Sequence, residues 1–278
     1  MKTQHKEQSI QPKQFQNMFS SSWKHVSSSW KLLGVSVIFD LAFLLIVSYV
    51  LLLTFQAVAA PIKEIQDISG SLVLNDLQPG SVQTRFMEAY GELMAALGVM
   101  FVSVLAAWVL LQGVAWCVAH RMAKSKISIA RFSRRFVLIT FLACVSLLVM
   151  FAVVGNIGAV LNNGFMVPSS DLLGYVSLIG VIVVFYLTVL GYASIPSLHR
   201  WRDYISVLVS HWRASLVAYA ANLVIIVLAN VLTSLALGIS LWLTYGLILL
   251  VLPAYAYGRV LMIESVKTFN DPSLCSGS

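Results

Sequence analysis

The stretch Leu32–Gln56 reads LLGVSVIFDLAFLLIVSYVLLLTFQ and holds one charged residue, Asp40. As an α-helix it rises about 1.5 Å per residue, which is long enough to cross a hydrocarbon core of about 30 Å. Five similar stretches follow, so the predicted spans are 32–56, 94–119, 136–161, 173–197, 214–237 and 239–258. The sequence therefore predicts an all-α fold, a polytopic transmembrane bundle of six helices.

Composition excludes a soluble globular domain. Of the 278 residues 59% are hydrophobic and only 10% are charged, whereas soluble domains average about 25% charged residues. The net charge of +7 comes from basic residues in the segments beside the spans, where anionic lipid headgroups are the natural partner. We therefore expect the lipid bilayer as a partner, and no nucleic acid.

The distribution of Lys and Arg predicts the orientation. With both termini in the cytoplasm, the cytoplasmic segments hold 16 of the 18 basic residues, as the positive-inside rule requires. The polar N-terminus and the length of the first span argue against a cleavable signal peptide. The expected organisation is a basic aromatic segment over 1–31, a transmembrane domain over 32–262 and a tail over 263–278, in a multi-pass protein of the cell membrane.

The segments between the spans carry further predictions. Phe15, Phe19, Trp23 and Trp30 recur at helical intervals and indicate an amphipathic helix at the cytoplasmic interface, the alternative being a disordered tail. Residues 57–93 are expected to form an acidic loop on the other side, with Pro61 at a helix start and Pro79-Gly80 at a turn. Ser81 can then cap a helix that continues directly into the second span.

The basic cytoplasmic segments are candidates for lipid contact. Residues 120–135 hold six Lys or Arg and no acid, and residues 198–213 mix Arg with Trp and Tyr. Such segments favour anionic headgroups. The candidate anionic-lipid contacts are Arg131, Arg134, Arg135, Arg200 and Arg202.

Three units of similar layout, each a basic segment followed by a helical hairpin, follow one another. Placing Trp30, Phe136 and Trp212 in register aligns Asp40, Ser146 and Asn222. A threefold repeat explains this alignment, and so does chance, because most membrane proteins alternate basic loops with spans.

The layout also resembles that of known families. RWRDYISVLVSHWR leads into WRASLVAYAANLVIIVLANV, and SSSWKLLGVSVIFDLAFLL opens the first span. This arrangement is similar to poorly characterised prokaryotic membrane families, among them the membrane domain attached to some glycerophosphodiester phosphodiesterases. The resemblance implies a six-span membrane domain. It does not carry over the phosphodiesterase activity, because that soluble domain is absent.

No catalytic motif was found. HExxH, GxSxG, GxxxxGK[ST] and GxGxxG are all missing, and no histidine has an acid or a cysteine at metal-ligand spacing. The five histidines are expected at interfaces or in loops. We therefore expect no enzymatic activity, no metal and no cofactor.

Asp40 is the one residue that resists a purely structural explanation. An ionised carboxylate in a span costs about 2.5–3.5 kcal/mol on insertion scales, so it must be neutral, paired or beside water. The candidate intramembrane polar site comprises Asp40, Asn222, Asn230, Asn156 and Gln112. The site could bind a proton or cation, or the carboxyl could join helices by hydrogen bonds or reach a basic residue such as Arg259.

Three functions follow from these patterns. The leading interpretation is a non-enzymatic scaffold or lipid-interacting component of the membrane. The alternative is a transporter of a small solute or ion that uses Asp40 as its coupling site. An intramembrane enzyme acting on lipid has the least support, because no catalytic pair can be named.

Overall fold

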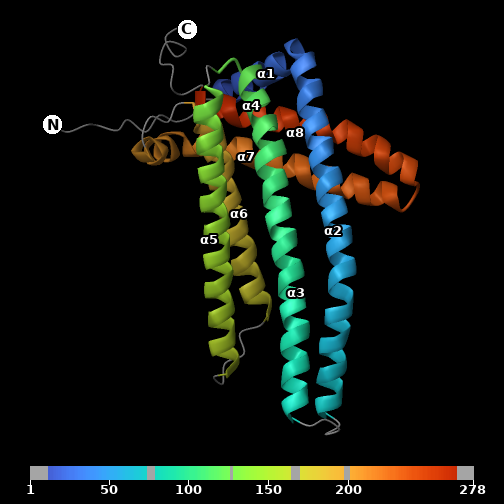
Figure 1. Cartoon of the computed structure of the whole chain (residues 1–278). Helices are drawn as coiled ribbons and strands as arrows, with labels where there is room; N and C mark the ends of the chain where they lie inside the picture. Colours follow the sequence, from blue (N-terminus) through green and yellow to red (C-terminus); the bar gives the residue numbers. More distant parts are fainter. Residues whose placement is uncertain (1–11, 74–78, 126–127, 164–169, 197–200, 268–278) are drawn as a thin grey trace, which may run out of the picture. The chain divides into compact units, whose positions relative to one another are not determined.

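A computed structural model describes residues 12–73, 79–125, 128–163, 170–196 and 201–267. Within these ranges all regular structure is helical, which confirms the predicted fold class. The elements shown in Figure 1 are α1 (Pro12–Ser28), α2 (Trp30–Val73), α3 (Pro79–Ala107), a π-helical turn (Trp108–Gln112), α4 (Gly113–Met122), α5 (Ile129–Asn163), α6 (Ser170–Ser194), α7 (Trp201–Leu237) and α8 (Leu241–Lys267).

Six helical stretches among the described residues are long and apolar enough to cross a membrane. They are Trp30–Ile68, Val82–Met122, Ile129–Val154, Leu173–Ser194, Trp212–Leu237 and Leu241–Lys267. Each contains one of the predicted spans or most of it. The chain is therefore a multi-span membrane protein.

The chain divides into two compact units. One comprises Ile38–Val114, and the other combines Met1–Val37 with Ala115–Ser278. We call them the hairpin unit and the main unit, and each is described by itself.

The hairpin unit is one antiparallel pair, with α2 beside α3 (Figure 1). The first half of the predicted loop over 57–93 is wrong, because α2 continues through Pro61 to Val73. Pro61 therefore lies inside a helix and does not start one. Proline removes one backbone hydrogen bond from a helix. Membrane helices tolerate this loss, because the other backbone groups have no water to bind in lipid and therefore keep their helical hydrogen bonds.

The helix predicted to lead from Ser81 into the second span is present as part of α3, which begins at Pro79. Pro79 stands at the first helical position, where proline is favoured.

The main unit holds two more hairpins. α5 packs along α6, and α7 packs along α8. The α7–α8 pair crosses α6, which contacts both helices (Figure 1). Outward-facing apolar side chains cover α7 and α8 on several sides, among them Val224, Leu228, Trp242 and Leu250. A helix that lies at the membrane surface keeps one polar face toward water. Because α7 and α8 are apolar on several sides, they require hydrocarbon around them.

Helix α1 is present as predicted, but its buried face differs from the aromatic one. Met18, Ser22 and Val26 are buried at intervals of four, and α1 packs against α8. Trp23 and Trp30 are exposed at 66% and 69%. The ring of Trp23 packs edge to face on Tyr257 of α8, with centroids 6.2 Å apart, and Trp30 is the first residue of α2.

Two helix boundaries differ from the predicted ones. The tail was placed from residue 263, whereas α8 continues to Lys267, and Met262, Ile263 and Val266 are among its most buried side chains. The basic aromatic segment before the fifth span is the first part of α7 and not a separate helix. At the end of α8 the apolar residues pack inside the main unit, whereas at the start of α7 Val207 is buried and Ile205 and Val209 are exposed. Both helices extend beyond the stretch that hydropathy alone selects.

Candidate functional site

The hairpin unit joins two of the five predicted polar-site residues. Asp40 on α2 is 3% exposed, and Gln112 at the end of the π-helical turn is 6% exposed. Gln112 Nε2 donates a hydrogen bond of 3.0 Å to Asp40 Oδ1. A buried carboxyl needs such a partner, because an unsatisfied one costs about 1–3 kcal/mol or more.

The π-helical turn Trp108–Gln112 lies at the point where this pair forms. Trp108 packs edge to face on Phe43, with ring centroids 5.5 Å apart. Phe43 is three residues after Asp40 on α2, and Trp108 is four residues before Gln112. Because both steps are about one helical turn, the two contacts lie side by side on the faces along which the antiparallel helices meet. A π-helical turn changes which side chains face a neighbouring helix and is frequent at functional sites.

A second pair lies at the far end of the same hairpin. Arg85 and Glu64 form an exposed ion pair of 3.0 Å. Asp40 and Glu64 are 24 residues apart on α2, which corresponds to about 36 Å. The buried pair of Asp40 and Gln112 and the exposed ion pair are therefore separate contacts between the two arms of the hairpin.

The three asparagines have other surroundings. Asn222 on α7 donates to the Gly258 carbonyl of α8 at 3.1 Å. A side chain at Gly258 would overlap the Asn222 amide, so glycine is needed for this close approach. Asn156 is exposed and donates to the Ala152 carbonyl of its own helix at 2.7 Å, and Asn230 is exposed. Asn222 therefore joins α7 to α8.

The candidate lipid contacts divide into three groups. Arg131 and Arg134 are exposed at the start of α5. Arg135 is half-buried and donates to the Ile195 carbonyl at 3.0 Å, where a cation stabilises the C-terminal end of α6. Arg200 lies outside the described residues, and the side chain of Arg202 is not described.

Sequence reasoning missed a polar cluster in the main unit, which we call the α8 junction and define as Ser21, His25, Ser36, Arg259, Glu264 and Lys267. Glu264 is 7% exposed. Its Oε2 accepts a hydrogen bond from Ser21 at 3.1 Å and its Oε1 accepts one from Lys267 at 3.2 Å. His25 Nε2 lies 4.0 Å from the same Oε1.

Two further contacts complete the α8 junction. The buried Arg259 donates to Ser36 Oγ at 3.1 Å, and Lys267 also donates to the Ala123 carbonyl. The end of α8 thereby holds α1, the start of α2 and the end of α4. In the sequence, Glu264 and Lys267 stand three residues apart at the start of the predicted tail over 263–278.

His120 corrects another prediction. It is fully buried, whereas the histidines were expected at interfaces or in loops. Its Nε2 lies 2.9 Å from the Tyr192 carbonyl, and since a carbonyl only accepts, Nε2 carries the proton. Phe132 and Trp116 pack around the ring. His5 and His199 lie outside the described residues.

Among the side chains that the structure describes, no group of three or more His, Cys, Asp or Glu could hold a metal ion. Comparison with protein-family models, with curated proteins and with solved structures gave no match. The arguments about function therefore depend on the geometry of this chain.

Proposed function

We propose that the chain is a non-enzymatic membrane component that binds anionic lipid headgroups in the cytoplasmic leaflet and acts there as a lipid-interacting scaffold. Both termini lie in the cytoplasm in this proposal, since 16 of the 18 Lys and Arg then face it. The layout resemblance to prokaryotic membrane families is consistent with such a role and supplies no catalytic residue.

The observation that carries the proposal is the exposed pair Arg131 and Arg134 at the start of α5. Val137, Phe141 and Leu142, one to three turns further along the same helix, are exposed apolar side chains. Guanidinium groups directly beside an outward apolar surface are placed for headgroup phosphates, and each such charge contributes about 1 kcal/mol near an anionic surface.

The test is lipid retention. The protein is reconstituted in nanodiscs that contain equal amounts of phosphatidylglycerol and phosphatidylcholine. It is then purified from them, and the lipids that remain bound to the protein are counted by mass spectrometry. We expect phosphatidylglycerol to be enriched around the native protein. The double variant Arg131→Gln/Arg134→Gln should lose most of that enrichment, and added salt should reduce it.

A charge-matched control is available in the hairpin unit, in the segment that the charge distribution predicts to be outside the cytoplasm. Lys63→Gln/Arg85→Gln removes two positive charges as well, and Lys63 is exposed. This control should retain the lipid preference of the native protein. Equal loss in both double variants, or an unchanged preference in Arg131→Gln/Arg134→Gln, would overturn the proposal.

A second candidate function is transport of a small solute or ion with Asp40 as the coupling site. The observation in its favour is a buried carboxyl beside a π-helical turn. Against it, Asp40 is buried and accepts a hydrogen bond from Gln112, a contact that joins two helices without binding a solute.

The two functions differ in what Asp40→Asn does. Asparagine keeps the shape and cannot carry charge. A transporter would lose proton-coupled uptake in liposomes while inserting normally. The lipid-binding scaffold would show native lipid retention and no uptake with either residue.

A further inference from the structure

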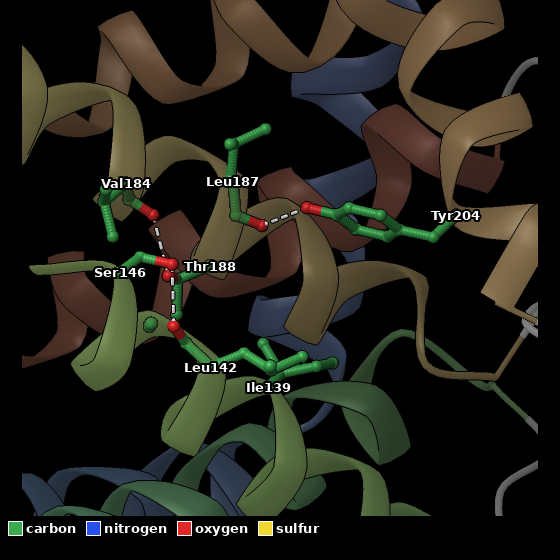
Figure 2. Close-up of a pocket in the computed structure, with 8 residues that line it drawn as sticks. Ile139, Leu142, Ser146, Val184, Leu187, Thr188 and Tyr204 are labelled. Carbon is green, nitrogen blue, oxygen red and sulfur yellow. Dashed lines mark hydrogen bonds between the residues drawn. The ribbon is translucent and has the colours of Figure 1, made fainter. Parts of the chain in front are cut away.

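A cavity of about 200 Å³ lies in the main unit between α5, α6 and the first turn of α7 (Figure 2). Its walls include Leu142 and Ser146 from α5, Val184 and Thr188 from α6, and Tyr204 from α7. At about 30 Å³ for a water-sized group, it has room for about six methylenes.

The hydroxyls in the wall donate their hydrogens to the protein backbone. Ser146 donates to the Leu142 carbonyl at 2.8 Å, Thr188 to the Val184 carbonyl at 2.7 Å and Tyr204 to the Leu187 carbonyl at 2.6 Å (Figure 2). Among the side chains that the structure describes, those that line the cavity are all uncharged. The wall therefore fits an apolar occupant, since a polar one would lose its hydrogen bonds to water.

The shape of the cavity indicates the direction of entry. Gly191 packs closely on Ile139, where an added Cβ would lie 3.1 Å from Ile139, so the helices are tightly joined at the end nearer Arg135. Leu142 lines the cavity and is 47% exposed, so the cavity reaches the outer surface of a candidate span. The medium at that surface is hydrocarbon, which leads to entry from within the bilayer.

The charges on α5 supply the second half of the argument. Arg131 and Arg135 precede Leu142 by eleven and seven residues, and at about 3.6 residues per turn all three fall on one side of α5. The exposed Arg131 is thus about 16 Å along the helix from the cavity. A phosphate held at Arg131 and Arg134 would leave its acyl chain running down the same side.

We propose that this cavity binds one acyl chain of an anionic glycerophospholipid whose phosphate lies against Arg131 and Arg134. The inference rests on the proposed function and adds a defined, saturable lipid site to it. The headgroup contact sets the charge preference, and the cavity holds the chain.

The experiment uses the full chain in nanodiscs with phosphatidylglycerol that carries a photoactivatable diazirine in the middle of one acyl chain, and adducts are mapped by mass spectrometry. We expect adducts on cavity residues that unlabelled phosphatidylglycerol suppresses severalfold more effectively than phosphatidylcholine does. Adducts at Phe141, which is exposed outside the cavity, should be diluted by both lipids equally.

Ala143→Phe fills the cavity, and Val145→Phe adds the same ring on the same helix at an exposed position outside it. Ala143→Phe should reduce cavity adducts severalfold, and Val145→Phe should leave them unchanged. Cavity adducts that are equal in both variants, or that phosphatidylcholine suppresses as well as phosphatidylglycerol does, would overturn the inference.

Two arms separate this inference from the proposed function. If Ala143→Phe leaves the adducts unchanged while Arg131→Gln/Arg134→Gln still loses phosphatidylglycerol enrichment, the cavity site is wrong and the lipid-binding function remains. If Arg131→Gln/Arg134→Gln leaves the phosphatidylglycerol enrichment unchanged and Ala143→Phe leaves the cavity adducts unchanged, the proposed function and the cavity site are both wrong. Failure of Ala143→Phe to fold is detected by gel filtration, and Ser146→Leu then serves as the smaller filling variant.

Discussion

Asp40 and Gln112 are 72 residues apart in the sequence and share a buried hydrogen bond of 3.0 Å, which joins α2 to the π-helical turn. Each residue was recognisable as polar within an apolar stretch. The pairing needs the register of two helices, which is set by packing of the whole hairpin.

Gln112→Leu should destabilise the hairpin unit by about 1–3 kcal/mol, because it removes a donor from a buried carboxyl. The double variant Asp40→Leu/Gln112→Leu should be more stable than Gln112→Leu alone, since the buried carboxyl is then removed together with its donor. Thermal unfolding in detergent measures both.

Asn156→Leu is the control for this cycle, since that exposed amide bonds only within its own helix and should change stability by less than about 0.5 kcal/mol. Additive effects of the Asp40 and Gln112 substitutions would contradict the pairing.

Gly258→Ala should destabilise the contact between α7 and α8 by about 1–3 kcal/mol, because the new methyl overlaps the Asn222 amide. Asn222→Ala should restore part of the loss when it is combined with Gly258→Ala. Gly246→Ala is a matched control on the same helix, because nothing lies within 4 Å of the added carbon. Equal destabilisation by the two glycine substitutions would argue against the close approach.

Glu264→Gln should loosen α1, because the buried carboxylate accepts hydrogen bonds from Ser21 and Lys267. Faster amide hydrogen exchange over α1 is the expected readout. Glu64→Gln is the control, since it breaks an exposed ion pair, which contributes only about 0–1 kcal/mol. Unchanged exchange over α1 in Glu264→Gln would show that α1 packs on α8 without this cluster.

Tyr204 should titrate late. The pKa of Tyr204 is raised from the ordinary 10 to about 12. Burial is the larger cause of the raised pKa, and the nearby Tyr186 is the smaller one. The raised pKa means that the folded state keeps its proton longer than the unfolded state does. The stability that Tyr204 contributes is therefore fully present below pH 10 and is lost as the pH rises through about 12.

Ultraviolet titration of phenolate absorbance tests this for Tyr204. The native protein should show a late-ionising component that Tyr204→Phe lacks. Tyr245→Phe is the control for the loss of one phenol, because Tyr245 lies on α8 and does not line the cavity. A late component that survives in Tyr204→Phe would assign it to another tyrosine.

Part of the candidate site followed from sequence patterns. Asp40 stood out because one charge in an apolar span is energetically costly, and Gln112 because it is polar in the next span. Asn156 and Asn230 were grouped with them on composition alone, although both are exposed. The burial of His120 and Glu264 could not be predicted, because it depends on residues far away in the sequence, such as Tyr192 and Ser21.

The sequence by itself determined that the protein is all-helical with six candidate membrane spans, because span length and hydropathy are local properties of the chain and lipid leaves a continuous helix as the way to satisfy the backbone. It could not determine that Pro61 lies inside a helix, that Gln112 faces Asp40, or that a cavity lies beside Leu142 and Tyr204. Those features depend on which sides of the helices meet. That choice is made by packing between distant residues, which only the tertiary structure decided.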